Sequence, residues 1–259
     1  MIMADNTADR GRAASGGVRI NKYLADSGRC SRREADRLIA EGLVTLDDKP
    51  AGPGMTVQPG QVVRLRGEPI LKDDDLVYIA LNKPAGITCT TDPDRSDNII
   101  AFLAYPKRVF PVGRLDRDSE GLIFLTNDGS IVNKILRAGN RHEKEYRVTV
   151  DHPITDDFVR RMSAGVPILD TVTRPCRVIP EGVHTFRIIL KQGLNRQIRR
   201  MCEVCGYDVT RLIRIRIMNV SLGTMKRGQW RYLTFKELAE IRRLTAASSQ
   251  VAVLDDSYD

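Results

Sequence analysis

The stretch GRLDRDSEGLIFLT, residues 113–126, joins a cluster of charged residues directly to a strongly apolar segment. From Gly121 onward it has the short run of branched and aromatic residues that is typical of a buried strand. Just before Gly121, residues 114–120 hold three carboxylates and two guanidinium groups. A charged loop that leads into a buried strand has a rigid support. This stretch is therefore the first candidate for both the core of the fold and a functional site.

Further strands and a helix are predicted on both sides of this stretch. The segments with strand-like sequences are residues 77–87, 143–150, 183–191 and 216–223. Residues 128–139 are predicted to form a helix that ends at Gly139. The mixed order of these elements, with spacings that suit hairpins, predicts an α+β fold. Its central sheet is expected to be mixed and mostly antiparallel, not doubly wound.

A small module is expected before this larger fold, over residues 18–66. It contains two short amphipathic helices, at 20–28 and 31–42, and strand-like segments at 43–51 and 61–67. Two helices and a few strands give a core that is too thin for much beyond binding.

The second of these helices begins with a capping box, formed by Ser31 and Glu34. Arginines gather around the start of the helix and away from its apolar face: Arg29, Arg32, Arg33 and Arg37. Backbone N–H groups at a helix start and guanidinium groups can bind the same phosphates. The spacing therefore favours contact with RNA or DNA over a merely solvated helix face.

The rest of the chain supports this two-part organisation. Residues 67–76, with Pro69 and an acidic run, are expected to form a linker, and residues 77–245 the larger domain. The polar ends, residues 1–17 and 246–259, are expected to be disordered tails without a signal peptide. No apolar run approaches the roughly 20 residues of a membrane helix. A cytoplasmic monomer that does not contact a membrane is expected, and its formal net charge of +8 favours polyanionic partners.

No metal or cofactor is indicated by the sequence. Cys202 and Cys205 form a C-x-x-C pair, but they fall on one apolar helix face with Ile198 and Met201, so core packing is the favoured interpretation. A second C-x-x-C and the glycine-rich nucleotide-binding motifs are missing from the sequence.

Asp116 is the candidate functional carboxylate of the charged loop. A carboxylate held beside arginines stays ionised, and an ionised carboxylate on a rigid support is a competent nucleophile. The alternative is a loop aspartate paired with Arg114 or Arg117. The segment NRQIRRM, residues 195–201, offers a helix start with Asn195 as a plausible cap and three arginines, which suits an anion site. Tyr146, a tyrosine among charges in a predicted strand, fits either packing or function.

Several of these segments together resemble a known enzyme family. The matching blocks are FPVGRLDRDSEGLIFLTNDG (110–129), LNKPAGI (81–87), EKEYRVTV (143–150) and GLNRQIRRMCEVCGYDVTRLIRIRIMNVSLG (193–223). They resemble the pseudouridine synthases of the RsuA/RluB/RluE/RluF family, which modify ribosomal RNA, and residues 134–173 are most similar to the F branch of that family. Residues 20–51 resemble the S4-type RNA-binding domain that precedes the catalytic domain in these enzymes.

The resemblance implies roles for individual residues. Asp116 takes the place of the catalytic aspartate, and Tyr146 that of the tyrosine that stacks on the uracil. Arg199 takes the place of the arginine that pairs with the aspartate, with Arg196 and Arg200 as rivals and as RNA-binding candidates. Arg114 is the candidate for filling the gap left by the displaced base. Lys83 and Pro84 match a motif of structural support.

The implied reaction converts a specific uridine to pseudouridine in large-subunit (23S) ribosomal RNA without metal or cofactor. Whether a transfer RNA is a second substrate, and whether Asp116 is a nucleophile or a base, stays open. Two alternatives also stay open. One is an RNA-binding or ribosome-assembly protein with an idle catalytic site. The other is a hydrolase that uses Asp116 together with Asp118 or Glu120.

Overall fold

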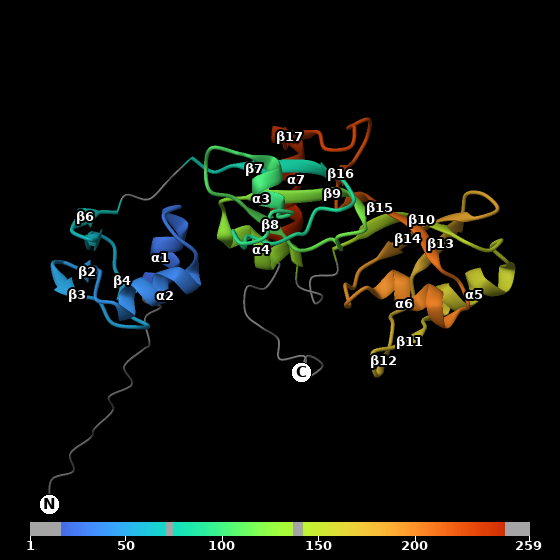
Figure 1. Cartoon of the computed structure of the whole chain (residues 1–259), viewed down its shortest axis with the longest axis horizontal. Helices are drawn as coiled ribbons and strands as arrows, with labels where there is room; N and C mark the ends of the chain where they lie inside the picture. Colours follow the sequence, from blue (N-terminus) through green and yellow to red (C-terminus); the bar gives the residue numbers. More distant parts are fainter. Residues whose placement is uncertain (1–16, 71–74, 137–141, 247–259) are drawn as a thin grey trace, which may run out of the picture. The chain divides into compact units, whose positions relative to one another are not determined.

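The structure of the chain, a computed structural model, describes residues 17–70, 75–136 and 142–246. It divides into two compact units, residues 1–74 and 75–259 (Figure 1). The expected tails, apart from Gly17 and Ala246, and the expected helix end at Gly139 lie outside the described residues.

The N-terminal unit packs two short helices against small sheets. Its elements are β1 (Val18–Arg19), α1 (Ile20–Asp26), α2 (Arg32–Ala40), β2 (Val44–Leu46), β3 (Lys49–Pro50), β4 (Thr56–Val57), β5 (Val63–Leu65) and β6 (Glu68–Pro69). Four of the strands form an antiparallel sheet in the order β3-β2-β5-β6, and β1 pairs with β4. The core includes Leu24 of α1 and Ala35, Leu38 and Ile39 of α2, so the predicted apolar face of α2 is confirmed.

Local sequence explains where α2 begins and ends. The Ser31 side chain accepts a hydrogen bond from the backbone N–H of Glu34, which satisfies one of the free donors at the helix start. Beyond the other end, Gly42 has a φ of 72°, a conformation that glycine adopts at little cost.

The N-terminal core includes residues beyond position 66. β6 pairs with β5, and Ile70 is 5% exposed within the same core. Sequence reasoning assigns residues 67–76 to a linker because Pro69 and the acidic run mask this last edge strand. Proline is compatible with an edge strand, whose outer side needs no hydrogen bonds.

The second unit is built on one large mixed sheet. Its strands are β7 (Tyr78–Lys83), β8 (Phe110–Val112), β9 (Glu120–Thr126), β10 (Lys144–Val150), β13 (Arg177–Pro180), β14 (Thr185–Leu190), β15 (Val209–Ile217), β16 (Val220–Ser221) and β17 (Trp230–Tyr232). The order is β13-β14-β10-β15-β9-β7-β17, with β8 beside β9 and β16 beside β15. Only β9 and β15 pair in parallel among these described strands. The predicted α+β fold with a mostly antiparallel sheet is confirmed.

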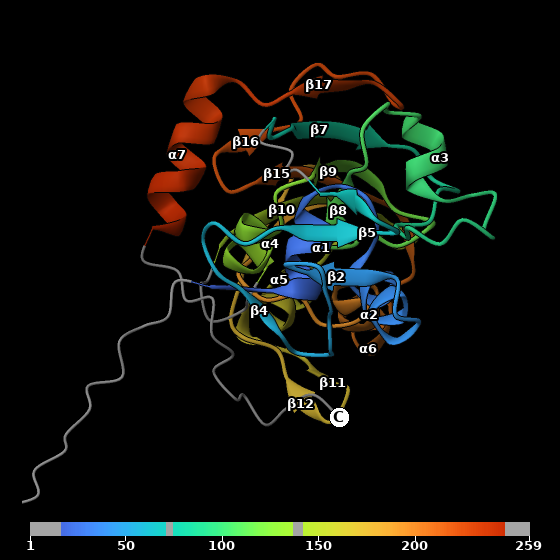
Figure 2. The same cartoon turned by 90° about the vertical axis from the view of Figure 1, so that its left-hand side faces the viewer.

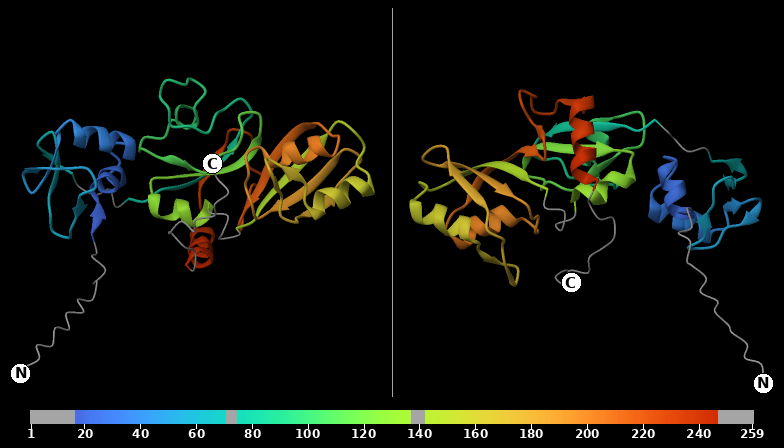
Figure 3. Two further views of the ribbon diagram at one scale, coloured as in Figure 1. Left: turned by 90° about the horizontal axis from the view of Figure 1, so that it is seen from below. Right: turned by 180° about the vertical axis from the view of Figure 1, so that it is seen from behind.

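Helices cover the sheet differently along its length. They are α3 (Ile99–Leu103), α4 (Gly129–Leu136), α5 (Asp156–Ala164), α6 (Gln197–Val204) and α7 (Phe235–Thr245), and β11 (Pro167–Ile168) and β12 (Thr171–Val172) form a separate hairpin. α5 and α6 pack on the half made of β10, β13 and β14 (Figures 1 and 3). On the half made of β7 and β9, α3 lies on one face and α4 and α7 lie on the other (Figure 2).

The two halves meet where β9 pairs with β15. This pairing joins only Glu120 to Ile213 and Gly121 to Arg214. Gly121 has a φ of 106°, and a Cβ atom there would lie 2.3 Å from the carbonyl oxygen of Arg214. The strand that follows the charged loop therefore approaches β15 through a position that only glycine can occupy.

One predicted strand is wrong in its extent. Residues 216–223 form two strands, not one: β15 ends at Ile217, and the chain turns at Met218, which has a φ of 52°, before β16. The apolar residues on both sides hide this turn, because Met218 and Val220 are themselves buried.

Replacing Gly121 with Ala should destabilise the second unit by about 3 kcal/mol or more, since the new methyl group overlaps backbone atoms and φ is positive. Urea unfolding measures this loss. Gly182→Ala is the matched control, because no atom lies within 4 Å of the added Cβ. It should change stability by less than about 0.5 kcal/mol. Equal stability of the two variants would contradict the close approach.

Candidate active site

The charged loop between β8 and β9 carries Asp116 at the junction of the two sheet halves. The backbone N–H of Ser119 donates to the carbonyl of Asp116 at 3.0 Å, which closes a tight turn. The Asp116 side chain is 34% exposed, so a solvent-borne reactant can reach its carboxylate.

The side chain of Lys83 anchors this loop. Its side chain is completely buried, and its ammonium donates to the carbonyls of Ile87 (2.8 Å), Pro84 (3.0 Å) and Arg117 (3.3 Å). The N–H of Gly86 donates to the same Arg117 carbonyl at 2.8 Å. Burial lowers the pKa of Lys83. The ammonium therefore ties the residue after Asp116 to the loop after β7.

Two arginines from the start of α6 lie beside Asp116. One carboxylate oxygen of Asp116 is 3.9 Å from Arg196 Nη1 and 4.0 Å from Arg199 Nε. These are ion-pair distances, too long for hydrogen bonds. Arg199 is anchored by its other nitrogens, which donate to the Val209 carbonyl (3.1 Å) and to Ser119 Oγ (3.3 Å). Its buried Nε has no hydrogen-bond partner among the described residues.

The expected cap of this helix is wrong. Arg196, not Asn195, is the residue at the N-cap, and it adopts a left-handed conformation with a φ of 49°. Asn195 instead accepts hydrogen bonds from Arg200, through its backbone carbonyl (3.2 Å) and its side-chain oxygen (3.4 Å). The unusual backbone at Arg196 brings that side chain to Asp116, whereas Arg200 is held at Asn195.

The other arginines of the charged loop have different surroundings. Arg117 pairs with Asp97 at 3.1 Å, not with Asp116. Arg114 is exposed, and its backbone carbonyl accepts a hydrogen bond from Arg214 Nη1 at 3.3 Å. In the described part of the chain, Asp116 forms no ion pair with Arg114 or Arg117, so the alternative of such a pair is not supported.

Tyr146 lies on β10, where it is partly buried. Its ring packs against two core clusters, one around β14 and α6 and the other around β7 and α3. The pairing of β10 with β15 is irregular here, because Glu145 faces Arg216 and Tyr146 faces Arg214, which leaves Ile215 as an extra residue on β15. Such bulges redirect side chains and are frequent near active sites. This one sets Arg214 opposite Tyr146.

Arg214 is a component of this region that sequence reasoning missed. It is only 3% exposed, and it donates to the carbonyls of Leu122 (2.6 Å) and Arg114 (3.3 Å), one on each side of Asp116 in the sequence. Its Nη2 is buried without a hydrogen-bond partner among the described residues. The signal was an arginine within the apolar run RLIRIRI, where a buried position was expected to be aliphatic.

The region is strongly electropositive. Lys144, two residues before Tyr146 on the same face of β10, is partly buried. Burial, with the nearby Arg214 guanidinium, lowers the pKa of Lys144 to about 8. Lys83, Arg199 and Arg214 contact the loop that carries Asp116, and Lys144 lies near Arg214. Such a site suits a polyanionic substrate.

The predicted RNA-binding arginines of the N-terminal unit form a separate group. Arg29, Arg32, Arg33 and Arg37 are all exposed. Arg37 lies near Glu34 (3.5 Å) and Glu41 (3.8 Å), which are weak surface contacts. The cluster therefore remains available to a ligand.

Sites of two other kinds are not formed by the described residues. In the described ranges no three metal-ligating side chains gather in one place. Within the same ranges, no helix combines the length and the apolar character needed to cross a membrane.

The sequence matches two protein families. Residues 77–204 match the RNA pseudouridylate synthase family, and residues 18–63 match the S4 domain. The chain is 60% identical, over 90% of its length and 81% of the relative, to the dual-specificity RNA pseudouridine synthase RluF of Escherichia coli (strain K12). It is 36% identical, over 92% of its length and 96% of the relative, to an uncharacterized RNA pseudouridine synthase of Mycobacterium leprae (strain TN).

A solved structure is also similar. A crystal structure of a pseudouridylate synthase superimposes with a TM-score of 0.64 at 25% identity, covering 88% of this chain and 99% of the other. The resemblance inferred from the sequence is confirmed by these matches.

Replacing Lys144 with Met should reduce the rise in the free energy of unfolding between pH 8 and pH 10. The unfolded chain holds this proton up to the ordinary lysine pKa of 10.5, whereas folded Lys144 releases it near 8. The folded state is therefore penalised below pH 8, and the penalty, about 3 kcal/mol at most, disappears as the pH rises. Urea unfolding across this range measures the effect. The exposed Lys236 supplies the control, Lys236→Met, and identical pH profiles for both variants would refute the buried ammonium.

Proposed function

Because the chain belongs to the RNA pseudouridylate synthase family, we propose that it converts a specific uridine of large-subunit (23S) ribosomal RNA to pseudouridine, with Asp116 as the reacting carboxylate. The observation that carries the assignment of Asp116 is its position. It is a partly exposed carboxylate beside Arg196 and Arg199, on a loop that the Lys83 side chain anchors.

The reaction breaks the bond between N1 of uracil and C1′ of ribose and forms a bond between C5 and C1′. Asp116 would act as a nucleophile on the nucleotide or as a base at the ribose, and either role requires an ionised oxygen. Arg199 Nε, 4.0 Å away and without a hydrogen-bond partner among the described residues, would hold that oxygen in place. The proton finally leaves C5, and Tyr146 or water would accept it. No step calls for a metal, a nucleotide or a redox group.

The target uridine would leave its stack before it reacts. Flipping costs a few kcal/mol, and stacking on an aromatic ring recovers roughly 1–3 kcal/mol. Tyr146, partly buried beside two core clusters, would be a rigid stacking surface. Arg114, exposed on the same loop as Asp116, would occupy the space that the base leaves in the RNA.

The RNA substrate is proposed from the resemblance and the relatives. The relative from Escherichia coli is named a dual-specificity RNA pseudouridine synthase. We therefore include a second RNA class, transfer RNA, in the proposal. The exposed Arg29, Arg32, Arg33 and Arg37 of the S4 domain would contact RNA phosphates. The enzyme would act as a monomer in the cytoplasm.

The hydrolase alternative that pairs Asp116 with Glu120 is disfavoured by the surroundings of Glu120. Glu120 is held by Arg211 (3.1 Å) and Arg227 (3.0 Å), so it serves as a structural anion. Release of free uracil from RNA would revive this alternative.

Replacing Asp116 with Asn should lower pseudouridine formation by at least about 10³-fold, because the ionised oxygen is lost while the shape is kept. Quantitative mapping of pseudouridine in 23S RNA and transfer RNA transcripts measures the product. The matched control is Asp118→Asn, two residues along the same loop, where Asp118 is exposed. It should retain activity within about threefold. Wild-type protein that binds RNA but forms no pseudouridine would instead support the idle-site alternative.

Replacing Arg32 and Arg33 together with Ala should weaken RNA binding and make it less salt-dependent. Two lost phosphate contacts should reduce the slope of log K against log salt by about 1.5. The control removes two exposed cations from elsewhere in the same unit, Lys49 and Arg66. Fluorescence anisotropy across a salt series gives both slopes. An equal reduction in the two double variants would contradict a specific role for α2.

A further inference from the structure

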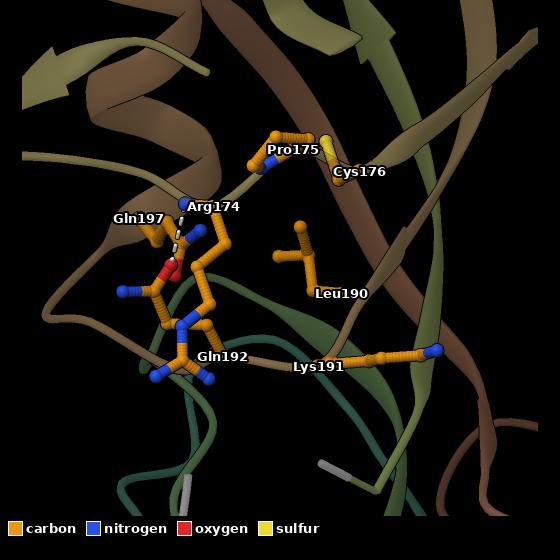
Figure 4. Close-up of a pocket in the computed structure, with 7 residues that line it drawn as sticks. All are labelled: Arg174, Pro175, Cys176, Leu190, Lys191, Gln192 and Gln197. Atoms are coloured by element: carbon orange, nitrogen blue, oxygen red, sulfur yellow. Dashed lines mark hydrogen bonds between the residues drawn. The ribbon is translucent and has the colours of Figure 1, made fainter. Parts of the chain in front are cut away.

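A pocket of about 150 Å³ lies beside the start of α6, outside the Asp116 site. It is lined by Arg174, Pro175, Cys176, Leu190, Lys191, Gln192 and Gln197. Figure 4 shows Arg174 and Gln192 together along one wall, Pro175 and Cys176 at the opposite rim, and Leu190 between them. We call this the α6 pocket.

The base of the α6 pocket is neutral and largely apolar. Leu190, an aliphatic side chain of the lining, is 3% exposed. Burial raises the pKa of Cys176 to about 11, so its thiol is neutral, and it donates weakly to the Met162 carbonyl. A ring could rest on these side chains without displacing a charge.

The wall of the pocket is rich in hydrogen-bond donors. The side-chain oxygen of Gln192 accepts the backbone N–H of Arg174 at 3.0 Å, which leaves its NH₂ group for a ligand. Gln197 is arranged alike: its oxygen accepts from the Leu194 N–H at 3.0 Å, and its NH₂ group lies only 3.8 Å from the Met201 sulfur. The exposed Arg174 guanidinium has no ion pair among the described residues, whereas Lys191, the other cation of the lining, pairs with Glu143 at 3.6 Å.

Size and polarity together restrict the ligand. A cavity of similar volume in another protein holds one benzene ring, so the α6 pocket is sized for one six-membered ring. The donors of Arg174 and Gln192 call for a ring that carries acceptors at its edge. Pyrimidine bases meet both conditions, because they present carbonyl oxygens around a single ring.

We propose that the α6 pocket binds an unpaired pyrimidine nucleotide of the RNA substrate, distinct from the uridine that reacts. The base would lie on Leu190, with its oxygens accepting from Arg174 and Gln192. Gln197 of the pocket and Arg199 of the Asp116 site lie within one turn of α6, so this nucleotide would belong to the same bound RNA as the target. This inference rests on the proposed function and adds a determinant of which uridine is chosen.

The test compares two arginines three residues apart. Arg174→Met removes the pocket's guanidinium, and Arg177→Met removes an exposed arginine of β13 that does not line the pocket. On an RNA stem–loop that contains the target, Arg174→Met should raise KM five- to tenfold with kcat unchanged. Arg177→Met should leave KM within twofold.

Abasic substitution then identifies the bound nucleotide. At one unpaired pyrimidine the abasic RNA should show the same rise in KM, and Arg174→Met should have no additional effect on that RNA. Equal effects of the two arginine variants, coupling to no position, or coupling to a purine would each overturn the proposal. Anisotropy on the same RNAs makes the comparison without turnover. If the wild-type protein forms no pseudouridine, the proposed function is overturned. The anisotropy comparison on the same RNAs then decides whether the pocket binds the nucleotide.

Discussion

The buried ammonium of Lys83 is the interaction on which the rest of the site depends. It uses all three of its hydrogens on carbonyls, and one of them belongs to Arg117, directly after Asp116. A loop crowded with charge would otherwise move freely in water. An ammonium without water can be stable only if each donor has an acceptor. The same requirement that keeps Lys83 satisfied therefore fixes the backbone beside Asp116.

This constraint explains why the loop needs Gly121 and Arg214 on its other side. Arg214 donates to the carbonyls of Arg114 and Leu122, which precede and follow Asp116, and its own carbonyl leaves no room for a side chain at position 121. β7 and β15 are the strands on either side of β9. Lys83 from β7 and Arg214 from β15 thus hold the loop from both of them. Both are cations at almost completely buried positions, and such an arrangement costs stability. This loss of stability has a benefit in an enzyme that must attract RNA, because the buried positive charges also make the local electrostatic potential more positive.

Much of the fold was predictable from the sequence, and the features that were not predictable have physical reasons. The apolar run after Gly121 and the capped α2 follow local rules, so the sheet and the small module were predictable. The charged loop made Asp116 a candidate, but its neighbours in sequence are not its partners in the structure, and its role stays a proposal. By contrast, the left-handed Arg196 and the buried Arg214 depend on partners far along the chain, at Asp116 and Leu122. No local pattern contains such contacts. The turn at Met218 was hidden because its side chain is as buried as a strand residue.

The unsatisfied donors of the structure gather where the substrate is proposed to bind. Among the described residues, three buried side-chain atoms have no hydrogen-bond partner, and two of them are Arg199 Nε and Arg214 Nη2. Buried polar groups in folded proteins are nearly always paired, so each exception calls for an explanation. The third, Arg187 Nε, lies against the Glu181 carboxylate and has its charge balanced there. Arg199 Nε faces the Asp116 carboxylate at 4.0 Å, a distance too long for a hydrogen bond. Arg214 Nη2 is left without a hydrogen-bond partner among the described residues. Stability is thus given up beside the loop that carries Asp116, the carboxylate proposed to react.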